Sequence, residues 1–217
     1  VALRALGIGS GDEVITTPFT WISTAETIAL VGAKPVFADI EADTYNIDPR
    51  EVEKLITART KAIIAVNLFG QMADYTTLEA IAEKHGLKII EDAAQSFGAE
   101  QNGLKSGTIG AVSCTSFFPA KPLGGYGDGG AVFTADAQLG EALRAVTNHG
   151  CKERESHYIL GTNGRCDSLQ AAIIKAKFTN FRDEEITLRQ QVGARYSEAL
   201  KDHLTVPVIH PGNTHIY

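Results

Sequence analysis

The sequence predicts an α/β protein built on a mostly parallel mixed sheet with helices on both faces. Apolar runs of strand length alternate along the chain with segments in which apolar residues recur at helical spacing. This alternation is typical of βαβ units, whose crossover helices cover a parallel sheet. Turn and cap residues separate the segments, so each element can be given an approximate range.

In the first half of the chain, expected strands and helices follow one another closely. Asp48 and Pro49 indicate a helix start, because an N-cap residue precedes proline at the first helical position. His85 and Gly86 indicate a helix end with glycine at the C-cap. We expect strands at residues 14–16, 35–39, 62–66 and 87–91, and helices at residues 25–31, 49–56 and 75–85.

The second half predicts a division of the chain. Two further strands are expected at residues 112–118 and 131–134, and helices at residues 137–147, 168–178 and 184–200. The polar run at residues 182–185 interrupts the apolar rhythm between the last two helices. We therefore expect residues 1–181 to form a large domain, and residues 182–217 to form a linking helix and the incomplete start of a small domain.

Composition and charge exclude several classes of function. The formal net charge of −6 is unlike the clustered basic surface of a nucleic-acid-binding protein. No apolar run approaches the ~18 residues of a membrane span, and the first residues lack the pattern of a signal peptide. The 3 cysteines and 6 histidines show no metal-ligand spacing. We expect a cytoplasmic protein with free thiols and no metal, with neither nucleic acid nor membrane as a partner.

The glycine-rich run at residues 124–130 contains the spacing G-x-G-x-x-G. That spacing indicates dinucleotide binding only where it follows a strand and opens a helix. Here the expected strand at residues 131–134 comes after it, so a nicotinamide-dependent dehydrogenase is disfavoured. A tightly turned loop in which backbones pass close together explains the glycines better.

Lys121 stands shortly before this run, between Ala120 and Pro122. Pro122 favours an extended backbone at Lys121, which fixes how the side chain is presented. One interpretation is an ordinary solvated loop lysine. The other is a Schiff-base lysine, whose amine is made reactive by desolvation and neighbouring positive charge.

Two other clusters contain residues suited to such a site. Asp92 follows an expected strand, and ligands of open α/β sheets bind beyond the carboxyl ends of strands. Asp92 with Gln95 also fits a helix capping box. Trp21 offers a flat face for a cofactor ring, and the hydroxyls around it suit an anion at a helix start. The alternative is that Ser23 or Thr24 caps a helix while Trp21 lies in the core.

These motifs together resemble the DegT/StrS-type sugar aminotransferases, which use pyridoxal 5′-phosphate (PLP). The similarity extends over nearly the whole chain, and its most specific part is the segment around Lys121. Within the family, the sequence is similar to enzymes that make 3-amino sugars on UDP-linked N-acetylhexosamine uronates for bacterial surface polysaccharides. The matching segments are residues 11–15, 91–96, 116–130 and 161–165.

The resemblance implies a role for each matching residue in a fold-type-I aminotransferase. Lys121 is expected to hold PLP as a Schiff base and then to act as the general acid and base. Asp92 is expected to pair with the pyridinium nitrogen, which keeps the ring an effective electron sink. The other expected PLP contacts are Gln95 near the ring oxygen, Trp21 against the ring face, Ser116 at the phosphate, and Asn163 at the phosphate of a neighbouring subunit.

The resemblance also implies a substrate and an assembly. Arg165 is expected to bind a substrate carboxylate in bidentate fashion, and His215 and Tyr217 to line the sugar pocket. The implied reaction transfers the amine of glutamate, which leaves as 2-oxoglutarate, to a UDP-linked keto-sugar in a homodimer with shared active sites. Family members are longer than this chain, which opens inside an apparent helix without an initiating Met, so we expect a fragment truncated at both ends.

Two alternative functions remain open. A PLP-binding regulatory or sensory domain without turnover fits the same cofactor residues. Some relatives are pyridoxamine-dependent sugar dehydratases, but they usually have His in place of the Schiff-base lysine, so Lys121 argues against that function.

Overall fold

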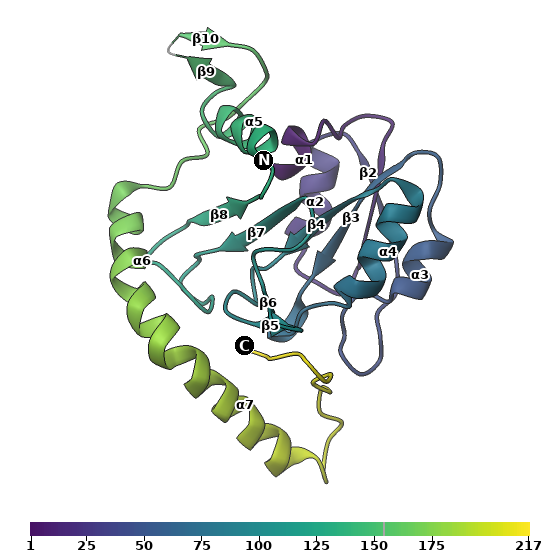
Figure 1. Cartoon of the computed structure of the whole chain (residues 1–217), viewed down its shortest axis with the longest axis vertical. Helices are drawn as coiled ribbons and strands as arrows, with labels where there is room; N and C mark the ends of the chain where they lie inside the picture. Colours follow the sequence, from purple (N-terminus) through teal and green to yellow (C-terminus); the bar gives the residue numbers. More distant parts are fainter. Residues whose placement is uncertain (154) are drawn as a thin grey trace.

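The computed structural model describes residues 1–153 and 155–217 and contains a six-stranded central sheet (Figure 1). The strand order is β2-β1-β3-β4-β7-β8. All neighbouring pairs are parallel except β7 and β8, which are antiparallel. The expected mostly parallel mixed sheet is therefore confirmed. The strands are β1 (Glu13–Thr16), β2 (Lys34–Phe37), β3 (Thr60–Val66), β4 (Lys88–Asp92), β7 (Val112–Ser116) and β8 (Gly130–Phe133).

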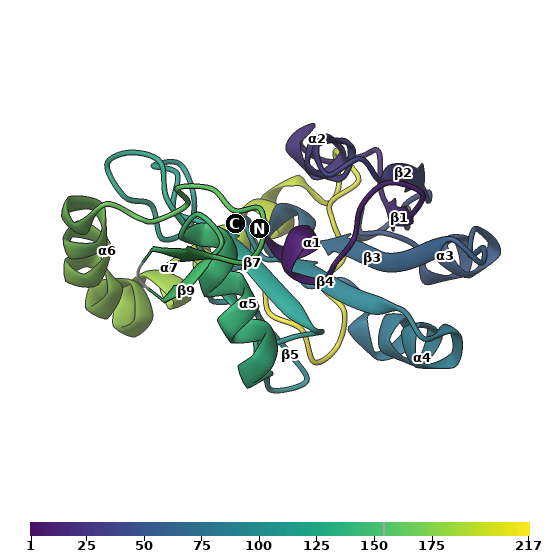
Figure 2. The same cartoon turned by 90° about the horizontal axis from the view of Figure 1, so that it is seen from above.

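Helices cover both faces of this sheet, because successive strand residues point to opposite sides. On β1, for example, Val14 belongs to a core cluster that includes residues of α1, α2 and α5, whereas Ile15 belongs to one that includes residues of α3 and α4. Figure 2 shows the helices distributed around the sheet. The helices are α1 (Ala2–Ala5), α2 (Ser23–Leu30), α3 (Pro49–Lys54), η1 (Leu68–Gly70), α4 (Tyr75–His85), α5 (Ala137–Thr147), α6 (Ser168–Asn180), η2 (Phe181–Glu185) and α7 (Ile186–Leu200).

Most predicted elements are found within a few residues of their expected ranges. The caps explain two of them: Asp48 accepts a hydrogen bond from the backbone of Arg50 at the start of α3, and Gly86 ends α4 with a φ of 66°. The helix α1 agrees with the apparent helix in which the sequence opens, whereas η1 and the two short hairpins were not expected. These hairpins pair β5 (Glu100–Gln101) with β6 (Leu104–Lys105) and β9 (Cys151–Glu153) with β10 (Ser156–His157).

The expected interruption at residues 182–185 is not a break in the helix. The π-helical segment η2 joins α6 to α7, so the polar run lies within a continuous helical stretch. Its first residue, Phe181, is buried against Phe97, with ring centroids 6.2 Å apart. This buried ring fixes η2 to the sheet, which the polarity of its neighbours concealed. The proposed boundary between residues 181 and 182 remains a prediction.

After α7 the chain returns to the sheet, as Figure 1 shows for its C-terminal end. The backbone N–H of Ile216 donates to the carbonyl of Gly70 at 3.2 Å, and that of Thr214 donates to Glu100 at 2.8 Å. Ile216 is fully buried in the core. These contacts bring the last residues next to η1, which directly follows β3.

Three further properties concern the residues that the structure describes. The helices within residues 1–153 and 155–217 all lack the length and apolarity needed to cross a membrane. Cys114, Cys151 and Cys166 are free thiols. In the same part of the chain, His, Cys, Asp and Glu side chains form no group of three or more that could hold a metal ion.

Candidate cofactor site

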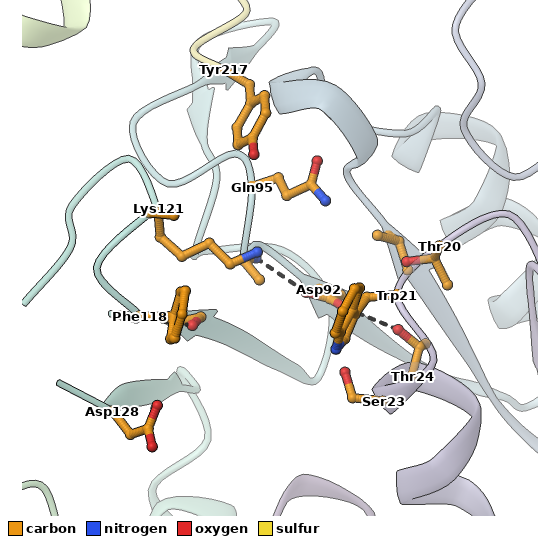
Figure 3. Close-up of a pocket in the computed structure, with 14 residues that line it drawn as sticks. Thr20, Trp21, Ser23, Thr24, Asp92, Gln95, Phe118, Lys121, Asp128 and Tyr217 are labelled. Atoms are coloured by element: carbon orange, nitrogen blue, oxygen red, sulfur yellow. Dashed lines mark hydrogen bonds between the residues drawn. The ribbon is translucent and has the colours of Figure 1, made fainter.

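A cavity of about 430 Å³ lies beyond the carboxyl ends of β4 and β7. Figure 3 shows side chains from several separate segments directed into it. This position follows from the topology, because loops at the carboxyl edge of a parallel sheet converge on one side. The lining residues are Thr20, Trp21, Ser23, Thr24, Val66, Asp92, Ala94, Gln95, Ser116, Phe118, Ala120, Lys121, Asp128 and Tyr217.

Asp92 is the last residue of β4 and provides the buried carboxylate of the cavity. Its Oδ1 accepts a hydrogen bond from the backbone N–H of Ala94 at 3.1 Å, and its Oδ2 accepts one from the hydroxyl of Thr24 at 3.4 Å. Burial raises the pKa of Asp92 above its ordinary value of 3.8, although the two hydrogen bonds and the charge of Lys121 oppose this rise. The site therefore favours a positive group beside this carboxylate.

The capping-box interpretation of Asp92 and Gln95 is wrong. Residues 94–98 form turns rather than a helix. The side chain of Gln95 does not bond back to Asp92, and its Oε1 instead accepts a hydrogen bond from the backbone N–H of Phe69 at 2.9 Å. Gln95 thus lines the cavity while it connects the turn after β4 to η1.

Lys121 lies in the loop that follows β7, on the other side of the cavity from Trp21 (Figure 3). Its backbone N–H donates to the carbonyl of Phe118 at 2.9 Å, and its side chain is half-buried. The side chain points across the cavity toward Asp92, whose pKa the lysine charge lowers. Lys121 is therefore not directed into open solvent, although its chemical role remains a prediction.

The glycine run beside Lys121 allows this loop to turn tightly. A Cβ on Gly124 would collide with the carbonyl oxygen of Pro119 and would lie 2.7 Å from its carbon. A Cβ on Gly130 would lie 2.7 Å from the carbonyl oxygen of Thr115. The close backbone approach expected from the sequence is confirmed, and β8 follows the run where a dinucleotide-binding motif requires a helix.

Trp21 lies in the loop before α2 with its ring at the cavity. It is 73% exposed, so the alternative of a core tryptophan is wrong. Neither Ser23 nor Thr24 caps α2, which has no side-chain cap hydrogen bond. The hydroxyl of Thr24 is directed at Asp92 instead.

Ser116 and Tyr217 also line the cavity, from elements far apart in the sequence. Ser116 ends β7, and its hydroxyl accepts a hydrogen bond from the backbone N–H of Phe118 at 3.2 Å. Tyr217 reaches the cavity because the backbone of the last residues packs against Gly70. A Cβ at Gly70 would lie 2.6 Å from that of Tyr217.

Asn163, Arg165 and His215 lie outside the cavity of this chain. Asn163 forms an isolated bridge with Asn148, whose side-chain oxygen accepts a hydrogen bond from Arg165 at 2.7 Å. Both residues are exposed, and their predicted contacts remain predictions. His215 forms an isolated β-bridge with Gln71, and its ring packs against Gly193 of α7. Burial there lowers the pKa of His215.

Asp128 and Phe118 also line the cavity, although neither was expected as a site residue. Both lie within the matching segment at residues 116–130, and their proximity to Lys121 in the sequence was the available signal. A cluster of aromatic rings from Phe19, Tyr45 and Phe69 was also missed, with centroids 5.9–6.3 Å apart. The sequence separation between these rings hides their contact.

The cavity suits PLP by the chemistry of its side chains. Asp92 matches the protonated ring nitrogen, because burial raises the pKa of this carboxylate and a positive group beside it offsets the cost of burying its charge. Lys121 supplies the amine, and the exposed indole of Trp21 supplies a flat apolar face. Hydroxyls of Ser116 and Ser23 at the same cavity suit phosphate oxygens.

Residues 1–216 match the sequence profile of the DegT/DnrJ/EryC1/StrS aminotransferase family. The chain belongs to this family. DegT/DnrJ/EryC1/StrS aminotransferases are PLP-dependent, which agrees with the groups assembled around Asp92 and Lys121.

Curated relatives of the chain include both a named aminotransferase and a named regulatory protein. It is 54% identical to the UDP-2-acetamido-2-deoxy-3-oxo-D-glucuronate aminotransferase of Pseudomonas aeruginosa, over 100% of this chain and 60% of that protein. It is 48% identical to a pleiotropic regulatory protein of Geobacillus stearothermophilus, over 100% of this chain and 59% of that protein. The chain thus spans about 60% of the length of these relatives.

Solved structures of the family share the fold. A DegT/DnrJ/EryC1/StrS aminotransferase from Brucella abortus matches with a TM-score of 0.96 and 45% identity, covering 100% of this chain and 60% of that one. DesV of Streptomyces venezuelae, in complex with a ketimine intermediate, matches with a TM-score of 0.94 and 40% identity, covering 100% and 58%.

Proposed function

We propose that the protein is a PLP-dependent aminotransferase that moves an amino group from glutamate to a UDP-linked keto-sugar. The observation on which the proposal depends is that Lys121, Asp92 and Trp21 line one cavity at the carboxyl edge of the sheet. The 54% identity to an aminotransferase named for a UDP-linked 3-oxo-glucuronate supports the substrate class.

The chemistry follows from what each residue can do at its position. When bound, PLP supplies an electrophilic carbon and an electron-withdrawing ring. Lys121 Nζ would be the amine that holds the cofactor, and when free it would accept a proton at one reacting carbon and return it at another. Asp92 would hold a positive charge at the ring nitrogen, and the indole of Trp21 would cover one face of the ring and exclude water there.

The substrate contacts extend this proposal beyond the cavity. Arg165 binds a carboxylate of glutamate or of the uronate, and His215 and Tyr217 contact the sugar. Asn163 reaches the cofactor phosphate of a neighbouring subunit, so the working unit is a homodimer with shared active sites. The exposed positions of Asn163 and Arg165 are compatible with contacts to a second subunit. We place the enzyme in the cytoplasm, in the synthesis of amino sugars for bacterial surface polysaccharides such as O-antigen.

The covalent step has a direct test in the full-length protein. With PLP added, the protein should absorb visible light, and borohydride should fix the cofactor on Lys121 as a mass increase of that peptide. Lys121→Ala should lose both signals and about 10²-fold to 10⁴-fold in rate, the usual contribution of a general acid or base. Lys105→Ala, at an exposed position on β6, is the matched control. A wild-type protein that stays colourless with PLP contradicts the proposal.

A second candidate is a PLP-binding regulatory protein without turnover, which the name of the Geobacillus relative favours. Glutamate separates the two functions. When glutamate is added to an aminotransferase loaded with PLP, the cofactor is converted to its pyridoxamine form and 2-oxoglutarate is released. A regulatory domain leaves the cofactor and the glutamate unchanged. A sugar dehydratase is the weaker alternative, because Lys121 occupies the position at which such relatives usually have His.

A further inference from the structure

Glu91 is a fully buried carboxylate next to Asp92 that the proposed chemistry does not use. Its Oε1 accepts hydrogen bonds from Asn67 Nδ2 at 2.9 Å and from the hydroxyl of Ser106 at 2.8 Å. Its Oε2 accepts from the backbone N–H groups of Gly107 at 3.0 Å and Ile109 at 3.2 Å. Acceptance on both oxygens is the pattern of an ionised carboxylate.

The four donors around Glu91 are all neutral, so the arrangement is costly. A buried charge is tolerated only when hydrogen bonds replace its water, and an apolar residue in the same strand would avoid the penalty altogether. The two preceding residues, Ile89 and Ile90, are buried and apolar, so the interior part of β4 could have continued with an apolar residue. Simple packing therefore does not account for Glu91.

The partners of Glu91 are connected to two segments: the turn after β4, which lines the cavity, and η1, which is hydrogen-bonded to that turn. Asn67 Nδ2 also donates to the hydroxyl of Ser96 at 2.9 Å, and the hydroxyls of Ser96 and Ser106 lie 2.6 Å apart. Ser96 belongs to the turn that places Ala94 and Gln95 at the cavity. The hydrogen-bond network of Glu91 thus includes a residue of this turn, Ser96.

The second segment is η1, which directly follows Asn67. The backbone N–H of Asn67 donates to the carbonyl of Asp92 at 3.1 Å. Two residues further, the backbone N–H of Phe69 donates to Gln95 Oε1 at 2.9 Å. Phe69 has a φ of 54°, a conformation that non-glycine residues adopt only when the surroundings impose it. Glu91 is therefore connected through Asn67 to η1, which donates to Gln95, and through Asn67 and Ser96 to the turn that contains Gln95.

We propose that Glu91 is a positioning residue, which fixes Gln95 and the end of β4 at Asp92 for cofactor binding through Asn67, Ser96 and Ser106. The inference rests on the proposed function, since it assumes that PLP occupies this cavity. Glu91 does not itself face the cavity, so it acts only through its partners.

The first test is Glu91→Gln in the full-length protein. The amide has one oxygen and one NH₂, whereas the site presents donors to both oxygens. If the NH₂ of the new amide takes the place of Oε2, it faces the N–H groups of Gly107 and Ile109. If it takes the place of Oε1, it faces the NH₂ of Asn67, so in either orientation a donor meets a donor. We expect PLP to bind about tenfold more weakly or worse, the scale on which loss of an outer hydrogen-bond partner weakens metal sites.

Glu13→Gln is the matched control. Glu13 is also a buried glutamate on a strand, 3% exposed, and it also accepts several hydrogen bonds. It lies at the opposite, amino-terminal end of β1, away from the cavity. Both substitutions should lower the stability of the protein, but only Glu91→Gln should change the PLP affinity, measured by visible absorbance at a temperature where circular dichroism shows every variant folded.

The second test exchanges the two partners. In Asn67→Asp two carboxylates face each other, so PLP binding should weaken as well. In the double variant Glu91→Gln with Asn67→Asp, the new amide donates to the new carboxylate while its oxygen still accepts from Gly107 and Ile109. The new carboxylate retains a second oxygen for the hydroxyl of Tyr75, which donates to Asn67 at 2.8 Å. We expect the double variant to recover most of the affinity that each single variant loses.

The outcomes separate this inference from the proposed function. If wild type and Glu13→Gln bind PLP while Glu91→Gln binds it equally well, Glu91 is a structural residue only. If no variant, wild type included, binds PLP, the proposed function itself fails. Where Glu91→Gln does not fold, Ser106→Ala takes its place: it removes one donor from the same carboxylate and should weaken PLP binding in the same direction. Unchanged binding there overturns the inference.

Discussion

Asp92 and Glu91 are adjacent carboxylates with opposite surroundings, because neighbouring strand residues point to opposite faces of the sheet. Glu91 is enclosed by four donors on one side. Asp92 receives two hydrogen bonds and otherwise faces the cavity, where burial raises its pKa. The protein thus completes the environment of one carboxylate and leaves the other incomplete until a cation binds.

Asp92→Asn should therefore stabilise the cofactor-free protein while it weakens PLP binding. Burial raises the pKa of Asp92 in the folded state above 3.8, so the folded protein binds the proton more tightly than the unfolded chain. Stability from this group consequently falls as pH rises through the raised pKa, and the penalty is complete above it. Asparagine has no charge to desolvate and retains an oxygen for Ala94.

Thermal unfolding at pH 7, with and without PLP, measures both effects. The cofactor-free melting temperature should rise in Asp92→Asn, and the increase in melting temperature on adding PLP should shrink relative to wild type. At pH 3, where the folded wild type is largely protonated at this position, the stability difference between the cofactor-free proteins should diminish. A variant that binds PLP as tightly as wild type would show that Asp92 does not pair with the ring.

At the scale of elements, local signals were sufficient for the sheet and for much of the site. Lys121, Asp92 and Ser116 stand at or after the ends of strands, and parallel topology brings such positions to one edge. The contacts that the sequence did not predict are non-local. Phe181 is buried against Phe97, which is distant in the sequence, and the last residues pair with Gly70, which places Tyr217 at the cavity.

The loop between β7 and β8 gives a prediction at the same scale. Gly124→Ala should displace the segment that presents Lys121, because the new methyl group meets the carbonyl of Pro119 and lies 2.9 Å from the carbonyl oxygen of Phe118. We expect weaker PLP binding and a loss of stability of about 1–3 kcal/mol, as for other overpacked sites.

Gly140→Ala is the matched control for this change. Gly140 lies inside α5, where a Cβ would have its nearest neighbours at 3.7 and 3.8 Å. Alanine there should stabilise the helix by up to about 1 kcal/mol and leave PLP binding unaltered. Chemical denaturation and PLP titration of both variants provide the measurement. Equal PLP affinity in the two would mean that the loop tolerates the methyl group without moving Lys121.

For the molecule as a whole, buried carboxylates at the carboxyl and amino ends of the strands differ in how far their charge is compensated. At the carboxyl edge, Asp92 is held at a cost that cofactor binding can offset. At the amino edge, the carboxylate of Glu13 is fully partnered: it accepts hydrogen bonds from Thr57 at 2.6 Å and from Arg59 at 2.7 Å. The carboxylate that faces the cavity is thus the less stable of the two electrostatically, as expected where function and stability compete.

Acid should therefore unfold the protein partly through Glu13, far from the cavity. The hydrogen bonds from Thr57 and Arg59 lower the pKa of Glu13 from 4.5 to about 2 in the folded state. This group contributes stability above its unfolded value, and the contribution is lost as pH falls from 4.5 towards 2. Urea unfolding of the cofactor-free protein at pH 7 and pH 3 should show a smaller loss of stability on acidification in Glu13→Gln than in wild type. Glu51→Gln, which removes an exposed ion pair with Lys54, should behave as wild type. An unchanged pH dependence in Glu13→Gln would instead assign the acid sensitivity to other carboxylates.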